Sequence, residues 1–354
     1  MSRSILRAAL ALTAAFAFVA GLASAQAPAV NPKEAAQATA EQKQQISQPL
    51  NNAPVWKEIR SGEKQITTVR GRETNVLIQP EGQTWRALRV PIMFWGGLLL
   101  ALAVGGIAGF YLWRGAMAVA RKPGDRIIER FSAMDRYAHW TVAIVWVTLA
   151  ITGLILSLGK AVLLPVIGYT LFSWLATLAK TLHNFTGPIL IIGVPWLFIR
   201  FVRDNGIGAD DIRWFMNIKG YFTGHEHPSR RFNAGEKLVF WLVLVVATSV
   251  LIVSGIILLF PNFDQLRSTM QVANVVHMVA AYLSIALACV HVYLGTIGME
   301  GAYRAMRDGY VDASWAEHHH ALWYKEVAAG KAPQKFVVPD RTQPEQAAPR
   351  TRPA

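Results

Sequence analysis

The sequence has 354 residues, of which 53% are hydrophobic and 16% are charged, and it includes 12 tryptophans. A composition this apolar excludes an ordinary soluble domain and indicates several membrane spans. The net charge of +13 alone would suggest nucleic acid, but the basic residues cluster beside the apolar segments, which indicates membrane topology and no nucleic acid. The one cysteine, Cys289, excludes an intrachain disulfide, a four-cysteine iron–sulfur site and covalent c-type haem attachment.

The N-terminal part of the chain has the pattern of an exported protein. Residues 1–25 combine a basic start, an apolar core and the small-residue cleavage site Ala23-Ser24-Ala25, which predicts a signal peptide; an uncleaved anchor is the alternative. Residues 26–89 are rich in glutamine, alanine and proline and then polar, so we expect a periplasmic segment with a small β element around 65–79. We find no catalytic motif in it.

Five apolar segments follow, each about as long as a bilayer core requires. The predicted spans are residues 90–113, 136–158, 182–202, 237–260 and 274–298. The first is rich in glycine and has no ionisable side chain, which predicts an anchor or a helix-packing surface. Residues 161–179 contain Pro165 and Gly168, so we expect a loop and an interfacial helix there. The fold is predicted to be an all-α membrane protein, with one extra N-terminal span, a four-helix domain over 114–326 and a disordered cytoplasmic tail over 327–354.

Lysine and arginine counts in the connections predict the orientation of the spans. Segments 114–136 and 200–237 contain six and seven of these residues, whereas segments 159–182 and 261–274 contain two and one. The two basic connections and the C-terminus are therefore predicted to be cytoplasmic, and the N-terminus periplasmic, which agrees with an export signal. We expect a multi-pass protein of the bacterial inner membrane.

Two histidines of the last span, His277 and His291, share one helix face. They are 14 residues apart, close to four helical turns, so they lie roughly 21 Å apart along the helix. His139 opens the second span and His183 opens the third, and depth alone therefore pairs His139 with His291 and His183 with His277. The alternative is that each histidine hydrogen-bonds a neighbouring helix and has no other role.

Two opposed pairs of imidazoles inside a helical bundle are the arrangement that holds two haems, with one axial ligand from each side. Zinc would require four ligands at one depth, and a proton relay would require carboxylates, which the predicted spans lack. The other histidines, His225, His227 and the run His318-His319-His320, lie in predicted cytoplasmic segments, where surface histidines without cysteine or carboxylate partners rarely bind metal.

Several further residues fit this arrangement. Gly153, Gly187 and Gly255 lie at the depth of the periplasmic pair, where a missing side chain leaves room for a porphyrin; ordinary close packing of helices explains each equally well. Arg130 and Arg136 carry the charge that haem propionates need, although a solvated role beside the membrane is the simpler explanation for either. Gly153 and Gly187 join the four histidines as predicted cofactor-binding residues, and the histidines are the predicted metal ligands.

Six stretches of the sequence form a recognisable set. They are Glu129-Arg130-Phe131 with Asp135 to Trp140, Ile151-Thr152-Gly153, Leu182-His183 with Gly187, Asn233-Ala234-Gly235-Glu236-Lys237, the span of His277 and His291, and Trp315 to Trp323-Tyr324. Together they resemble the membrane cytochrome b subunit of respiratory formate dehydrogenases, over about residues 125–326. The exported region and the additional first span depart from the shortest, four-span members and resemble the longer form, the gamma subunit. Cytochrome b subunits of hydrogenases and thiosulfate reductases share the general plan.

The resemblance implies a four-helix bundle with two haems b, one at His183 and His277 and one at His139 and His291. It also implies two partners, an iron–sulfur subunit and a catalytic subunit that oxidises formate. Electrons would pass from these partners through the haems to a quinone near the cytoplasmic face.

The family's quinone pocket involves an Asn-Ala-Gly segment, which corresponds here to Asn233 and Gly235. The residues by themselves also make Asn233 an N-cap of the fourth span, with Glu236 completing a capping box, and one residue can serve both purposes. Two other functions stay open from the sequence. One is the same haem core with a different electron donor, such as a hydrogenase, and the other is a non-redox scaffold or transporter with structural histidines.

Overall fold

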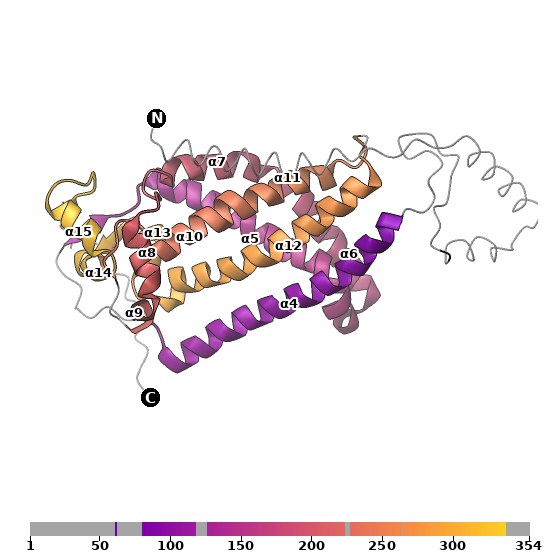
Figure 1. The fold of residues 1–354 in the computed structure, drawn as a ribbon, viewed down its shortest axis with the longest axis horizontal. Coiled ribbons are helices and arrows are strands. Elements are labelled where there is room, and N and C mark those ends of the chain that lie inside the picture. The colour runs from indigo at the N-terminus through magenta and orange to yellow at the C-terminus, as the bar shows by residue number, and fades with distance from the viewer. Residues whose placement is uncertain (1–60, 62–79, 118–125, 224–226, 264, 338–354) are drawn as a thin grey trace, which may run out of the picture. The chain divides into compact units, whose positions relative to one another are not determined.

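The computed structural model describes residues 61, 80–117, 126–223, 227–263 and 265–337 (Figure 1). The predicted signal peptide, most of the predicted periplasmic segment with its β element, His225 and residues 338–354 lie outside the described residues. The chain separates into two units. The first comprises Met1–Gly105, Thr141–Phe198 and Trp241–Cys289, and the second comprises Gly106–Trp140, Ile199–Phe240 and Val290–Ala354.

Long apolar helices dominate the structure and make this a multi-pass membrane protein. Within the described residues, four helical segments are long and apolar enough to cross a bilayer, namely Thr84–Arg114, Ala133–Val162, Ala234–Leu259 and Arg267–Gly298. Helices suit this environment because all backbone hydrogen bonds are made within the segment. The number rises to five if a pair of helices bent by 50° counts as one span.

Three of these helical segments have the following bounds. The first is α4 (Pro80–Arg114), which begins ten residues before the predicted span and includes the last ten residues of the segment predicted to be periplasmic. Next is α5 (Ala133–Val162), where Ser132 and Asp135 form reciprocal side-chain to main-chain hydrogen bonds that fix the helix start. The fourth predicted span consists of α10 (Ala234–Leu238), the π-helical segment η1 (Val239–Ala247) and α11 (Thr248–Leu259).

The third predicted span is where expectation and structure differ most. Residues 161–179 do not contain the expected loop; most of them belong to α6 (Leu164–Thr186), which is kinked at Gly168 with φ +76°. The span continues as α7 (Ile189–Phe201) after a break at Gly187 and Pro188. Proline cannot donate the hydrogen bond that would continue the helix, which accounts for the break. His183 therefore lies in the last turn of α6 and not at the start of the following helix.

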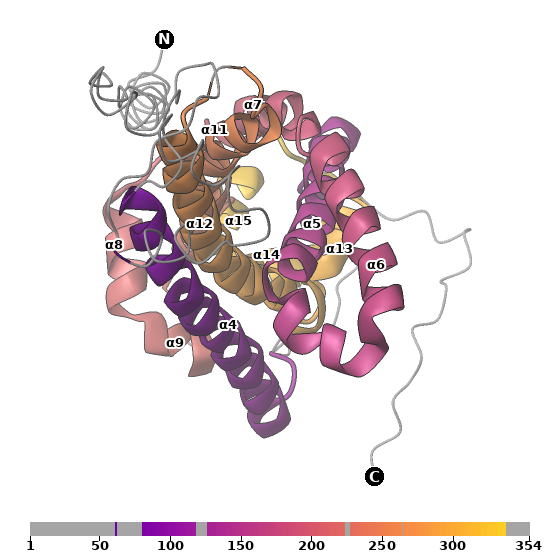
Figure 2. The same ribbon diagram turned by 90° about the vertical axis from the view of Figure 1, so that its right-hand side faces the viewer.

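The first unit is built around packed helices, with α12 (Arg267–Tyr293) contributing most of its length. Figure 2 views these helices close to end-on, with α4 against α12 and α6 beside α5. The hydroxyl groups of Ser157 in α5 and Tyr282 in α12 are 2.6 Å apart. A Cβ atom at Gly159 would lie 2.8 Å from the ring of Phe172, so α5 and α6 also approach closely. Ser157 and Tyr282 also line the cavity described below.

The second unit contains shorter elements and a small antiparallel sheet. The strands are β1 (Ile127–Glu129), β2 (Tyr310–Asp312) and β3 (Phe336–Val337), in the order β2-β1-β3. Besides α10, its other short elements are α8 (Ala209–Met216), α9 (Ile218–Thr223), η2 (Leu294–Gly298), α13 (Ala302–Arg307), α14 (Ala313–His319) and α15 (Ala321–Ala328).

The sheet corrects two expectations. The fold is mostly but not entirely helical, and the expectation of a disordered tail is wrong for Phe336 and Val337, which form β3. Ile128 is fully buried at the centre of the sheet and lies opposite Val311 on one side and Phe336 on the other. Strands of two or three residues leave almost no periodic pattern in a sequence, and their stability comes from partners nearly 200 residues away.

Gly309 allows the chain to turn into β2, and we predict that its replacement destabilises the second unit. Gly309 has φ +94°, its carbonyl accepts from the backbone N–H groups of Arg130 and Phe131, and a Cβ atom would lie 2.6 Å from the carbonyl oxygen of Phe131. Gly309→Ala should lower the thermal unfolding midpoint in detergent, because it adds this clash to a backbone strain of about 1–3 kcal/mol.

Gly330→Ala is the matched control, since Gly330 has φ +67° with open space around the position of a Cβ atom. It should lose only the strain contribution. Equal losses of thermal stability in the two variants would show that the contact with Phe131 is unimportant.

Candidate functional site

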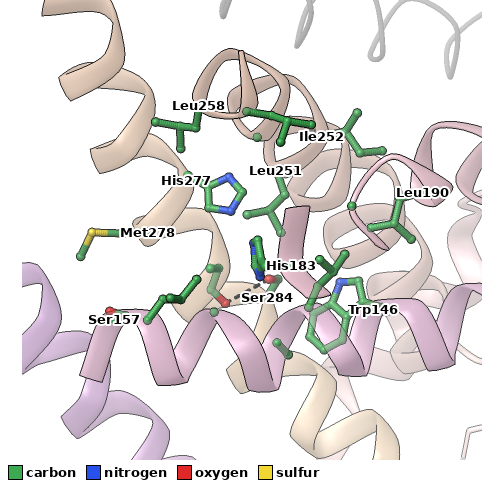
Figure 3. Close-up of a pocket in the computed structure, with 18 of the residues that line it drawn as sticks. Trp146, Ser157, His183, Leu190, Leu251, Ile252, Leu258, His277, Met278 and Ser284 are labelled. Carbon is green, nitrogen blue, oxygen red and sulfur yellow. Dashed lines mark hydrogen bonds between the residues drawn. The ribbon is translucent and has the colours of Figure 1, made fainter. Parts of the chain in front are cut away.

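His183 and His277 face each other across a cavity in the first unit (Figure 3). The centres of the two rings are 6.1 Å apart, and the ring planes make an angle of 68°. The cavity has a volume of about 290 Å³ and is lined mainly by apolar side chains, including Trp146, Leu190 and Leu251. An apolar cavity with a few convergent polar groups is the usual form of a cofactor site.

A hydroxyl group orients each of these two imidazoles. Thr152 Oγ1 donates to a main-chain carbonyl of its own helix at 2.7 Å, so its oxygen accepts from His183 Nδ1 at 2.9 Å. In the same way, Ser254 Oγ donates to a carbonyl of its helix at 2.6 Å and accepts from His277 Nδ1 at 2.9 Å. Both imidazoles therefore have the proton on Nδ1 and a lone pair on Nε2, the form that binds a metal through Nε2.

The residue after each hydroxyl side chain is a glycine. A Cβ atom at Gly153 would lie 3.3 Å from Cε1 of His183, and one at Gly255 would lie 3.4 Å from Cε1 of His277. Each glycine therefore lets an imidazole lie directly against the neighbouring helix, and each also lines the cavity. A Cβ atom at Gly187 would lie 3.2 Å from the carbonyl oxygen of His183, so this glycine both lines the cavity and permits the tight end of α6.

Thr152 and Ser254 are site residues to which the sequence patterns gave no role, although Thr152 belongs to the recognisable stretch Ile151-Thr152-Gly153. The signal that identifies them is a hydroxyl residue followed by glycine in the middle of an apolar span, as in Thr152-Gly153 and Ser254-Gly255. A serine or threonine in a membrane helix usually satisfies its hydroxyl on a carbonyl of the same helix, so it does not by itself suggest a further partner. Only the folded chain brings each one beside a histidine.

His139 and His291 form a second facing pair, in the second unit. His139 belongs to α5 and His291 to α12; their ring centres are 6.3 Å apart, with an angle of 56° between the planes. Nδ1 of His139 is buried and has no hydrogen-bond partner in the part of the chain that the structure describes. This imidazole therefore lacks the fixed proton position that the hydroxyl groups give to His183 and His277.

The spacing of both pairs fits two imidazoles bound to one metal ion. A metal–nitrogen bond of about 2 Å, with a little over 1 Å from the nitrogen to the ring centre on each side, separates the ring centres by about 6 Å. No group of three or more histidine, cysteine, aspartate or glutamate side chains that could hold a metal occurs among the described residues. Each pair can thus supply two axial ligands to a metal that a cofactor already holds, as in haem, but not the four ligands of a structural zinc site.

Asn233 caps the helix that begins the fourth span. Glu236 N donates to Asn233 Oδ1 at 2.9 Å, and Asn233 N donates to Glu236 Oε2 at 2.9 Å, which forms the predicted capping box. A Cβ atom at Gly235 would lie 3.3 Å from Asn233 Oδ1 and 3.3 Å from the ring of Trp214. Gly235 therefore lets the cap and this indole come together, and the two predicted quinone-site residues share one place in the second unit.

Arg130 is held by protein groups. Its Nη2 donates to Glu236 Oε1 at 2.9 Å and to the carbonyl oxygen of Arg231 at 2.7 Å, and the residue is only 3% exposed. Arg136 Nη1 donates to the carbonyl oxygen of Arg307 at 2.7 Å. The Arg130 guanidinium, which the sequence had offered to a cofactor carboxylate, instead neutralises the carboxylate of the capping box.

The histidine run is not at the surface, and the expectation of unconstrained surface histidines is wrong for His319 and His320. These side chains are 3% and 1% exposed, and their rings lie about 5 Å from the ring of Trp315. His320 Nδ1 donates to the carbonyl oxygen of Arg230 at 2.7 Å. The contact joins segments 90 residues apart, which no local pattern in the sequence could reveal.

A comparison with protein families identifies the chain. The model of the prokaryotic cytochrome b561 family matches residues 130–309, about half of the sequence. The chain belongs to the prokaryotic cytochrome b561 family. The matched region contains all four paired histidines together with Asn233 and Gly235, and it excludes α4 of this cytochrome.

Individual relatives of this cytochrome are subunits of formate dehydrogenases. It is 30% identical over 220 residues to the nitrate-inducible formate dehydrogenase cytochrome b556(Fdn) subunit of Escherichia coli K12, covering 59% of this chain and 95% of that protein. It is 32% identical over 209 residues to the formate dehydrogenase cytochrome b556(fdo) subunit of the same organism, covering 56% and 93%. For the cytochrome b556 subunit of Haemophilus influenzae formate dehydrogenase, the identity is 28% over 224 residues, covering 60% and 89%. The resemblance predicted from the sequence motifs is confirmed.

The buried His320 makes a prediction about acid stability. Burial and, to a smaller extent, the Arg130 guanidinium lower the pKa of His320 to about 3, against an opposing effect of Glu236. The folded state thus keeps this imidazole neutral, whereas the unfolded chain protonates it near pH 6.5. Stability from the neutral imidazole is complete above about pH 6.5 and is lost as the pH falls from there toward 3.

We expect His320→Asn, which retains an N–H donor, to weaken this pH dependence of the thermal unfolding midpoint between pH 7.5 and pH 5. His227→Asn is the control and should keep the dependence of the unaltered protein. An equally steep fall in all three proteins would exclude His320 as its source.

Proposed function

We propose that this cytochrome is the membrane subunit of a formate dehydrogenase, that it holds two haems b, and that it reduces a quinone. The observation that carries the proposal is that two pairs of imidazoles face each other. The ring centres are 6.1 Å apart for His183 and His277 and 6.3 Å apart for His139 and His291. The relatives named as formate dehydrogenase subunits favour formate over hydrogen as the ultimate electron source.

The residues of the His183–His277 site each have a defined task. Thr152 and Ser254 fix the tautomer and the orientation of the imidazoles, so that both Nε2 atoms are free for axial ligation. Gly153 lets the His183 ring lie against the neighbouring helix, and the apolar side chains of the cavity suit an apolar ring system. A haem bound there would supply reversible one-electron transfer, at a potential set by its axial ligands and by the polarity around it.

The electron donor that we propose is a partner iron–sulfur subunit on the periplasmic side, which receives electrons from a catalytic subunit that oxidises formate. The acceptor is a quinone near the cytoplasmic face. Positive-inside charge counts support this orientation, with the N-terminus periplasmic and the C-terminus cytoplasmic in a bacterial inner membrane. Quinone reduction would then take protons from the cytoplasm while formate oxidation releases them outside, which separates charge without a pump.

Asn233 and Gly235 are the proposed quinone-site residues. The Asn233 side-chain oxygen is engaged in the helix cap, which leaves the amide NH₂ group as the donor available to a quinone carbonyl. Gly235 lets the cap and the Trp214 ring lie close together at the same point. The helix cap therefore positions the Asn233 amide group that would donate a hydrogen bond to the quinone.

The haem ligands can be tested one pair at a time. The full chain purified in detergent should give a reduced-minus-oxidised spectrum with cytochrome b bands and two haems per chain by haem extraction. His183→Ala and His139→Ala should each leave one haem, because haem b is held in the protein without a covalent bond and loses an axial ligand.

The control is His227→Ala, which alters a histidine outside both pairs and should retain two haems. Two haems per chain in both His183→Ala and His139→Ala would refute the pairing. A spectrum without cytochrome b bands would refute the whole redox function and favour a membrane scaffold or transporter with structural histidines.

The quinone role of Asn233 can be separated from its capping role. Asn233→Ser keeps an oxygen that caps the helix, so its thermal stability should match that of the unaltered protein, whereas Asn233→Ala should lose about 1 kcal/mol. Serine lacks the amide donor, and we therefore expect Asn233→Ser to reduce a quinone analogue at least about tenfold more slowly in the complete complex supplied with formate. Formate should still reduce the haems at the normal rate. Normal quinone reduction in Asn233→Ser would leave Asn233 as a helix cap alone.

A further inference from the structure

Helix α4 precedes the family region and nevertheless forms part of the wall of the cavity between His183 and His277. Its residues Gly82, Trp85, Arg89 and Gly96 lie within about 60° of each other around the helix axis at 100° per residue. These four residues therefore form one face of α4. The contacts of three of them show where this face lies.

The α4 face packs against α12. Trp85 Nε1 donates to Asn274 Oδ1 at 3.1 Å, and a Cβ atom at Gly82 would lie 3.3 Å from the side chain of Gln271. Farther along, a Cβ atom at Gly96 would lie 2.4 Å from the ring of Tyr282, a distance that only glycine tolerates. Because Asn274 and Tyr282 both line the cavity, these contacts hold α4 at its edge.

Arg89 is the cation on this face. It is half-buried, its guanidinium carbon lies 5.6 Å from the ring centre of Trp85, and it lines the cavity. It is the one lining residue with a permanent charge, and no described carboxylate forms an ion pair with it. An arginine at the edge of an apolar cavity is stabilised by an anion, and its planar guanidinium matches a carboxylate with two parallel hydrogen bonds.

We propose that Arg89 binds a carboxylate of the cofactor held between His183 and His277, so that α4 is part of this binding site. The inference rests on the proposed haem function, since haem b has an apolar ring with two carboxylate side chains at one edge. It assigns the anchoring charge of this site to a helix outside the family region. A phospholipid headgroup offers similar anion chemistry, and the experiment separates the two.

The experiment compares the full chain with Arg89→Gln, purified in detergent with haem bound. We expect haem transfer from the His183–His277 site to an apo-globin acceptor to become about tenfold faster, since a charged hydrogen-bonded pair is lost. The midpoint potential of that haem should fall, because a nearby positive charge favours the reduced iron. The haem at His139 and His291 should keep its potential and its retention.

Two matched variants sharpen the test. Arg86→Gln removes a charge from an exposed residue three positions earlier, outside the face that contacts α12, and should change neither haem. Arg89→Lys keeps the charge but loses the planar guanidinium with its two parallel N–H donors. The midpoint potential of the haem should therefore change less than in Arg89→Gln, while haem is still released faster than from the unaltered protein.

Each result has a distinct meaning. Unchanged haem retention and potential in Arg89→Gln, with two haems present, overturn the proposal and leave the haem function intact. Loss of bound anionic phospholipid from Arg89→Gln, measured by mass spectrometry with both haems unaffected, also overturns it and identifies a lipid site. Absence of haem from the unaltered chain refutes the haem function itself.

Discussion

The hydrogen bonds from the imidazole Nδ1 atoms to Thr152 and Ser254 are the interactions on which the proposed function most depends. Each hydroxyl first satisfies itself on its own helix and then accepts from a histidine of a neighbouring helix. The glycine that follows each one removes the atom that would keep the ring away. A hydroxyl residue followed by glycine thus occurs twice, and each time it orients a histidine side chain. As a result, the Nε2 lone pairs of the two histidines point toward each other.

A different constraint organises the second unit. The Glu236 carboxylate caps α10 through the backbone N–H of Asn233 and also pairs with the buried guanidinium of Arg130, the residue directly after β1. Breaking one member of such a buried ion pair costs several kcal/mol because the other charge remains uncompensated. The network therefore ties the helix cap that carries the proposed quinone donor to the sheet, and the buried His320 lies beside it.

Helix α4 gives the first unit a charged residue at the cavity, which the family region alone does not supply. Its close contact at Gly96 and its hydrogen bond from Trp85 bring one arginine to an otherwise uncharged cavity wall. A charge near a redox cofactor changes its potential without any change of axial ligand. A helix outside the family region can in this way contribute a charge to the site without any change in the residues of that region.

The sequence by itself determined the membrane class, the apolar segments and the spacing of His277 and His291 along one helix, because these depend on composition and on the regular geometry of a helix. It also determined the capping box at Asn233, which is local. Only the tertiary structure decided the break between α6 and α7, the strand pairing of Phe336, the burial of His320, the hydroxyl partners of His183 and His277, and the place of Arg89 at the cavity. Apart from the helix break, these features are contacts between segments distant in the chain. Such contacts depend on how helices pack, which the periodicity of one segment does not record.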